Sequence, residues 1–247
     1  MQRHPDYPNL KLVYGNEWRG LPLLPKQVSF GERYLEINLN VMKQAINRHR
    51  RTFVTLFILR YPHGYAIPPN GCISRFMRSL RAQIEADLKA RHRETGRSLT
   101  CDLNFLWARE IADSDNCHFH VAIFLNQDAY HRTGNYSLPI RSRRCEYCTS
   151  PIRDRATNLS QRISRAWATA IGVTEDQVTG LVDYPKNSDF HLDENEADFE
   201  FQFLRLFRRL SYYAKIRTKD YGESADCYGS SRTPPAAPFF ADYAYED

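Results

Sequence analysis

Two histidines separated by a single residue are the part of the sequence best suited to hold a metal ion. His118 and His120 stand at the start of a strand-like apolar run, and side chains two apart on a strand point to the same face. Both imidazoles can therefore approach one cation, while Phe119 points to the opposite face and the core. Glu110 precedes them across the polar segment 112–117, so a hairpin closing over this segment could bring its carboxylate to the same cation.

Two imidazoles and one carboxylate make a mixed donor set with coordination positions left open for water and phosphate oxygens. Such a site suits Mg²⁺ or Mn²⁺ acting on a phosphodiester, and Zn²⁺ fits the same donors. A chain with eight histidines contains such a pair by chance often enough that a histidine pair on a sheet surface explains the spacing equally well. The placement of Glu110 at hairpin distance favours the metal site.

A second chemical motif lies near the end of the last predicted helix, where Tyr212 and Lys215 are three residues apart and share one helical face. Tyr213 is rotated away by roughly 100° and is expected to pack. A phenol with a pKa of about 10 needs help to act as a nucleophile. A metal can polarise a scissile phosphate, and Lys215 can stabilise charge. Tyrosines at helical spacing are also common in cores, so this motif gains meaning from its combination with the histidines.

The elements that must position these residues follow from hydrophobic periodicity. The order of helix, strand, helix, hairpin, helix, strand and helix predicts an α+β fold, with a central antiparallel sheet and helices packed on it. The start of the first helix is open, because residues 35–41 also alternate like a strand. The predicted helices cover about residues 35–46, 73–88, 158–171 and 199–219, and the predicted strands cover residues 53–59, 103–111, 118–125 and 180–184.

Three regions are predicted along the chain of 247 residues. Residues 1–33 contain several prolines and are expected to form an irregular arm. Residues 34–219 form the main domain, with an arginine-rich, loop-like insert at 127–157. Residues 220–247 are rich in Gly, Ser, Pro, Tyr and Asp, which is typical of a partly ordered tail.

Composition indicates a soluble protein of the cytoplasm without a membrane partner. No apolar run approaches the roughly 20 residues that span a bilayer, and the N-terminus lacks the apolar stretch of a signal peptide. The six cysteines are expected to be reduced. Cys145 and Cys148 could belong to a zinc knuckle, but without a second such pair two ordinary thiols are favoured.

The net charge of +5 is mild, but its distribution is uneven. Residues 132–165 hold eight arginines against two acids, and residues 183–200 hold seven acids against one lysine. An arginine-rich segment suits phosphate contacts, although two oppositely charged solvated faces explain the pattern equally well. The arginines expected near the tyrosine site, or on a groove leading to it, are Arg141, Arg143, Arg144, Arg153 and Arg155.

Taken in order, these motifs resemble the HUH endonuclease superfamily of replication initiators, and more finely the replication proteins of filamentous phages (inoviruses) and related prophages. The resemblance covers about residues 34–232. The stretches that carry it are strand 53–59, Trp107-x-x-Glu110, His118-Phe119-His120-Val121, Leu125-Asn126, Trp167, Leu181-Val182, the segment Phe207 to Lys215, Thr218-Lys219 and the segment Tyr228 to Arg232.

The resemblance implies a ferredoxin- or RRM-like palm in which Glu110, His118 and His120 bind the metal, Tyr212 attacks and Lys215 stabilises charge. Residues 34–219 would then be a nicking domain using Mg²⁺ or Mn²⁺. It would nick and religate single-stranded origin DNA through a 5′-phosphotyrosine intermediate, for rolling-circle replication of a phage or related mobile element in a bacterial cytoplasm. Host replication proteins are further implied partners.

Several alternatives stay open. The family often has an aliphatic residue where Tyr213 stands, so a second catalytic tyrosine is one of them. Relaxases usually place the tyrosine before the histidine pair, and single-tyrosine transposases typically carry Gln rather than Lys near it, yet a strand transferase of either type uses the same chemistry. A non-enzymatic DNA-binding regulator could contact phosphates through Arg75, Arg78 and Arg81. A zinc hydrolase lacks a convincing third histidine.

Overall fold

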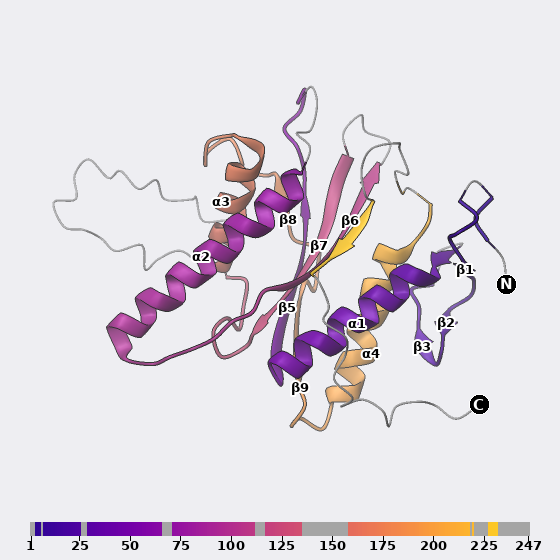
Figure 1. Ribbon diagram of the computed structural model, residues 1–247, viewed down its shortest axis with the longest axis horizontal. Coiled ribbons are helices and arrows are strands. Elements are labelled where there is room, and N and C mark those ends of the chain that lie inside the picture. The colour runs from indigo at the N-terminus through magenta and orange to yellow at the C-terminus, as the bar shows by residue number, and fades with distance from the viewer. Residues whose placement is uncertain are drawn as a thin grey trace.

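The structure is a computed structural model that describes residues 3–5, 7–25, 29–65, 71–111, 117–134, 158–217, 219 and 227–231. Within these residues, an antiparallel sheet of six strands runs through the middle of the molecule (Figure 1). The strand order is β10, β6, β7, β5 and β8, and β9 also pairs with β5. The strands are β5 (Arg51–Leu59), β6 (Asn104–Ile111), β7 (Cys117–Asn126), β8 (Val182–Asp183), β9 (Asp189–Asp193) and β10 (Tyr228–Ser230).

The sheet is buried on both faces, and alternate residues of its central strands enter two separate cores. In β5, Phe53 and Phe57 belong to one core, whereas Val54 and Leu56 belong to the other. β5 is paired along both edges, with β7 on one side and with β8 and β9 on the other. Its central position explains why the side chains of this strand are almost all apolar, and the strand predicted at residues 53–59 is confirmed.

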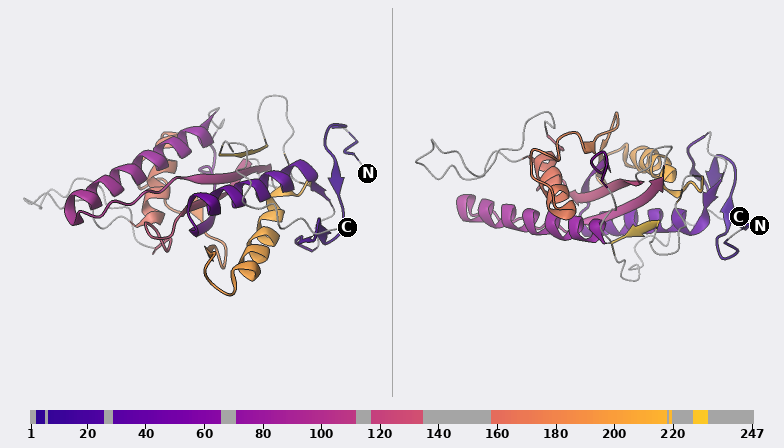
Figure 2. Two further views of the ribbon diagram at one scale, coloured as in Figure 1. Left: turned by 60° about the horizontal axis from the view of Figure 1, so that its bottom comes forward. Right: turned by 90° about the horizontal axis from the view of Figure 1, so that it is seen from above.

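Helices α2 (Cys72–Thr95) and α3 (Leu159–Ile171) cover the first face, and α1 (Glu32–Arg48) and α4 (Phe199–Leu210) cover the second. In both views of Figure 2 the strands run between these two pairs of helices. Phe76 and Leu80 of α2 pack with the fully buried Trp167 of α3. α3 begins after Asn158, which forms a capping box with Gln161. The predicted α+β fold, with a central antiparallel sheet and helices packed on it, is confirmed.

Strand β9 lies in the acidic segment 183–200, for which a solvated face was one explanation, and part of this segment is buried. Phe190 and Leu192 are buried in the core beneath α1 and α4, whereas His191 between them is exposed. Because the alternation is only five residues long, the surrounding acids dominate the composition of the segment. Pairing with β5 fixes it as a strand.

The last helix is shorter than predicted, and a helix continuing to about residue 219 is wrong. α4 ends at Leu210, a 3₁₀-helix η1 (Ser211–Ala214) follows, and Lys215 is extended with ψ 145°. Lys215 forms an isolated β-bridge with Phe30. The Ser211 hydroxyl accepts a hydrogen bond of 2.8 Å from the amide of Leu24, 187 residues away in sequence. The residues that follow the end of α4 are therefore held by contacts with the N-terminal region.

Both ends of the chain contribute regular structure. The arm, expected to be irregular, contains four short strands, β1 (Leu12–Val13) paired with β4 (Phe30–Gly31) and β2 (Glu17–Trp18) paired with β3 (Leu21–Pro22). Trp18 stacks on Phe207 of α4, with ring centroids 6.1 Å apart. β10 falls in the segment interpreted as a tail, and it is an edge strand of the central sheet.

Most of the arginine-rich insert, residues 135–157, lies outside the described residues. The predicted DNA-binding arginines Arg141, Arg143, Arg144, Arg153 and Arg155 and the thiols Cys145 and Cys148 all fall there. Among the described residues, no helix combines the length and the apolar character that a membrane span requires.

Candidate functional site

The hairpin of β6 and β7 brings the predicted metal ligands together. Glu110 lies directly opposite His118 in the register of the hairpin, and His120 lies opposite Ala108. Ala108 is buried in the core beneath α1 and α4, and alternate side chains of a strand share one face, so all three ligand candidates face these helices. The convergence expected from the strand spacing is therefore present.

The ligand atoms are close enough to share one ion. One ligand atom from each of Glu110, His118 and His120 lies within 4.8 Å of the others. The two Nε2 atoms are 3.1 Å apart, and His120 Nε2 is 3.3 Å from Glu110 Oε2. Two ligands of one metal at the usual bond length of about 2.1 Å lie about 3.0–3.4 Å apart at right or tetrahedral angles. All three side chains are buried, and the cluster could hold a metal ion.

Two lysines surround the carboxylate of the cluster. Lys215 Nζ is 2.9 Å from Glu110 Oε2, and Lys219 Nζ is 3.9 Å from Glu110 Oε1. Burial alone would raise the pKa of Glu110, but the hydrogen bond and charge of His120, together with both lysines, lower it to about 2. Glu110 is therefore ionised at neutral pH.

The same environment keeps His118 neutral. Burial is the main cause that lowers the pKa of His118, and the neighbouring His120 adds to it, so that its pKa is about 4. A neutral imidazole has a free lone pair, which is the form that binds metals. His118 Nδ1 is buried and has no hydrogen-bond partner among the described residues.

The two adjacent tyrosines lie in different environments at the end of α4. In Figure 1, α4 runs along the sheet toward the end at which β6 finishes and β7 begins. The half-buried Tyr212 packs edge-on against His120, with ring centroids 5.2 Å apart. Tyr213 is buried, and its hydroxyl donates a hydrogen bond of 3.0 Å to the carbonyl oxygen of Val121. The prediction that Tyr213 packs is confirmed.

Lys215 lies beside Tyr212, although the two are not on one regular helix. Its Nζ is 3.7 Å from the centroid of the Tyr212 ring. The β-bridge with Phe30 holds the backbone of Lys215, and Asn38 of α1 donates a hydrogen bond of 3.1 Å to the carbonyl oxygen of Leu210. The expected proximity is therefore reached through tertiary contacts instead of helical spacing.

Lys219 is the site residue to which the sequence analysis assigns no role. Its side chain is fully buried, and its backbone forms an isolated β-bridge with Glu110. Its Nζ is also 5.2 Å from the ring centroid of Tyr228 and 5.9 Å from that of Tyr34. The one sequence signal that Lys219 belongs to the site was its position in the Thr218-Lys219 stretch of the resemblance.

Comparison with known proteins assigns the chain to a family. The family model described as YagK/YfjJ C-terminal domain matches residues 17–231. The chain belongs to this family. The uncharacterized protein YagK of Escherichia coli strain K12 is 33% identical to it over 218 residues, which are 83% of this chain and 97% of YagK. The uncharacterized protein YfjJ of the same strain is 30% identical over 165 residues, or 66% of this chain and 72% of YfjJ. No solved structure matches the chain.

The YagK/YfjJ match contains the whole site. It begins at Glu17 in β2 and ends at Ser231, directly after β10, so it extends past both ends of the predicted domain 34–219. The strands of the arm from β2 onward and the edge strand β10 are therefore included in the YagK/YfjJ domain.

Proposed function

We propose that this protein cuts single-stranded DNA with Tyr212 and remains joined to the cut end. It acts as a replication initiator that nicks and rejoins origin DNA during rolling-circle replication of a phage or related mobile element. The observation that carries the proposal is the position of Tyr212 against the buried cluster of Glu110, His118 and His120. The motif order, which resembles that of HUH replication initiators, supports it.

Packing alone does not explain this cluster. A buried carboxylate with two lysines costs free energy of desolvation that apolar side chains in the same places would not. Glu110 is 2% exposed, and Lys215 and Lys219 are both buried beside it. Buried groups with strongly shifted pKa values beside a half-buried phenol are typical of functional sites.

The reaction exchanges one phosphodiester for another. The phenol oxygen of Tyr212 attacks a phosphorus of the DNA, and the bond between that phosphorus and the 3′ oxygen breaks. The phenol loses its proton and the departing 3′ oxygen gains one, which leaves a 5′-phosphotyrosine and a free 3′-hydroxyl. Attack by a 3′-hydroxyl on the phosphotyrosine reverses these steps and rejoins the strand.

The residues around Tyr212 have distinct parts in this reaction. Glu110, His118 and His120 would hold Mg²⁺ or Mn²⁺, which when bound supplies positive charge at the phosphate and orients it for in-line attack. Lys215 lies over the Tyr212 ring, where its ammonium stabilises the negative charge that develops on the phenol oxygen. The five arginines of the insert remain a predicted phosphate-binding surface.

Two-colour labelling of single-stranded DNA tests the proposal. Random-sequence oligonucleotides with one dye at the 5′ end and another at the 3′ end are incubated with the protein and Mn²⁺, and denaturing gels then separate protein from DNA. The dye at the 3′ end should migrate with the protein, and the dye at the 5′ end should not, because the tyrosine retains the 5′-phosphate. Tyr212→Phe removes only the nucleophilic hydroxyl and should abolish the adduct.

Tyr213→Phe is the matched control, since it removes one hydroxyl from the adjacent residue. It should retain most of the adduct, although losing the hydrogen bond to Val121 should lower the free energy of unfolding by about 1 kcal/mol. Loss of the adduct in Tyr213→Phe alone would make Tyr213 the nucleophile. DNA binding without any adduct in the unmodified protein would overturn the nicking proposal in favour of a DNA-binding regulator.

A further inference from the structure

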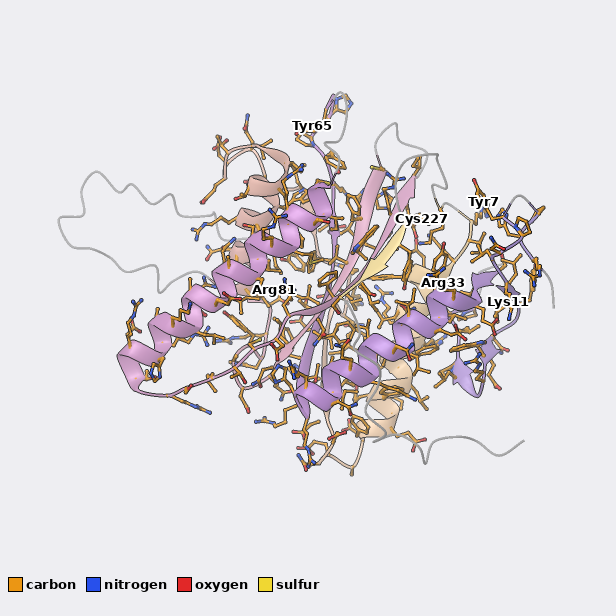
Figure 3. The ribbon with its side chains drawn as sticks, in the orientation of Figure 1. Tyr7, Lys11, Arg33, Tyr65, Arg81 and Cys227 are labelled. Atoms are coloured by element: carbon orange, nitrogen blue, oxygen red, sulfur yellow. The ribbon has the colours of Figure 1, made fainter. Side chains whose placement is uncertain are left out.

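A cavity with aromatic walls lies between the N-terminal arm, α1 and β10. Its volume is about 320 Å³, and its lining includes Tyr7, Asn9, Arg33, Tyr34, Cys227 and Tyr228. Figure 3 labels Tyr7, Arg33 and Cys227 on the side of the molecule where the arm meets α1 and β10. We call this space the tyrosine cavity. Pockets of this size with apolar and aromatic walls and a few polar groups are typical small-ligand sites.

The walls of the tyrosine cavity suit a flat aromatic ring next to a negative charge. Tyr34 and Tyr228 are stacked, with ring centroids 4.5 Å apart and planes inclined by 18°. Tyr7 is 40% exposed, so its ring is accessible. Among the described residues that line the cavity, Arg33 is the one with a charged side chain. Aromatic rings that stack on bases and a cation that contacts the backbone are the features by which proteins bind single-stranded nucleic acid.

A second cavity of similar size has an acidic lining, which disfavours DNA as its ligand. It measures about 350 Å³, and Asp189, Asp193, Glu196 and Asp198 line it together with two arginines and one histidine. Arg51, one of these arginines, is already paired with Asp193 at 3.0 Å. Four carboxylates repel the phosphates of a DNA strand, whereas the lining of the tyrosine cavity, as far as the structure describes it, contains no acidic residue.

Lys219 connects the tyrosine cavity to the candidate metal centre. Its Nζ is 5.2 Å from the ring centroid of Tyr228, on the cavity wall, and 3.9 Å from Glu110 Oε1. One buried side chain therefore separates the cavity from the cluster at which Tyr212 lies.

We propose that the tyrosine cavity binds one nucleobase of the single-stranded DNA, near the phosphate that Tyr212 attacks. The proposal rests on the proposed function and adds a base-binding site built by the arm and β10. The base stacks beside Tyr7 and Tyr34, and Arg33 contacts the adjoining phosphate. The cavity thereby sets the position of the strand relative to Tyr212.

Binding measurements with and without bases test this site. The parent protein carries Tyr212→Phe, the variants are made in this parent, and all are kept in chelator, so no cleavage occurs. Fluorescence anisotropy then gives the affinity for a labelled mixed-sequence oligonucleotide of about twelve nucleotides and for an abasic backbone of equal length. Tyr7→Ala should weaken binding of the first about tenfold, the scale of one lost base stack, and leave the second unchanged. Arg33→Gln should weaken binding of both.

Tyr14→Ala is the matched control, because Tyr14 is a 48% exposed tyrosine of the same arm that does not line the cavity. It should bind both oligomers as the parent does. Equal affinities of the Tyr7→Ala and Tyr14→Ala variants, with circular dichroism confirming that both are folded, would overturn the base site while leaving the nicking proposal intact. No binding of either oligomer by the parent would overturn both proposals.

Discussion

In His118, burial sets the charge state of a candidate metal ligand. Burial and the proximity of His120 lower its pKa from 6.5 to about 4. The imidazole is therefore neutral in the folded protein over a pH range in which a free histidine would be charged. The lowered pKa, which leaves His118 in the neutral form that binds metals, therefore also makes the stability of the metal-free protein depend on pH.

Stability of the metal-free protein should fall as the pH is lowered from 7 to 4. In this interval the unfolded chain protonates His118 and the folded chain does not, so protons favour unfolding. At about 1.36 kcal/mol per pKa unit, the free energy of unfolding loses roughly 3 kcal/mol through this residue. Urea titrations in chelator at several pH values, compared with His118→Asn, measure the loss.

The contribution of Glu110 falls in a different pH range and can be separated. Its pKa is lowered from 4.5 to about 2, so its stabilising effect is present above pH 4.5 and is lost only between these two values. The difference between the unmodified protein and His118→Asn should therefore arise above pH 4.5. Parallel pH profiles of the two proteins would show that His118 is not buried as a neutral ring.

At the scale of elements, β10 secures the edge of the sheet beside the site. It pairs with β6, and its Gly229 lies against the indole of Trp107. A Cβ on Gly229 would come within 2.5 Å of Trp107 side-chain atoms, closer than any real contact. The preceding residue, Tyr228, contributes to the environment of Lys219. Glycine is thus needed at this position for β10 to pair closely with β6.

Gly229→Ala should therefore destabilise the protein, whereas Ser230→Ala in the same strand should not. Overpacking against Trp107 is expected to cost about 1–3 kcal/mol, because the indole or the strand must shift. Urea titrations give the stability. Hydrogen exchange of the Arg109 amide, which donates to the carbonyl oxygen of Cys227, reports locally on the strand. Equal stability and equal exchange in the two variants would contradict this account of β10.

At the scale of the whole molecule, segments distant in the sequence assemble a site whose charges do not balance. Glu110 supplies one negative charge, and Lys215 and Lys219 supply two positive charges around it. A divalent ion would add to this excess, so the metal centre alone is electrostatically unfavourable. In the proposed function, the phosphate of a bound DNA strand would supply the missing negative charge.

Metal and DNA should consequently bind with positive coupling. In the Tyr212→Phe variant, a single-stranded oligonucleotide should raise the affinity for Mn²⁺ about tenfold or more, and Mn²⁺ should raise the affinity for DNA by the same factor. Calorimetric titration of Mn²⁺ with and without DNA measures this. Lys215→Met should bind Mn²⁺ more tightly than the parent in the absence of DNA. A Mn²⁺ affinity that DNA leaves unchanged would contradict the charge argument.

The sequence by itself determined the features that depend on local periodicity. Side chains two apart on a strand share a face, which predicts that His118 and His120 converge, and the hairpin spacing adds Glu110. The long apolar run of β5 and the helical spacing in α2 and α3 likewise predict their elements. The divergence of Tyr212 and Tyr213 follows from adjacent positions on a helical turn.

Tertiary structure alone decided the features that depend on contacts between distant segments. Lys219 reaches Glu110 because α4 ends at Leu210 and the following chain bridges to Phe30 and to Glu110. β10 is too short to show a pattern, and pairing with β6 makes it a strand. Local propensity carries no information about partners more than 100 residues away, and such partners set the C-terminal end of α4, the place of β10 and the charge around the candidate metal ligands.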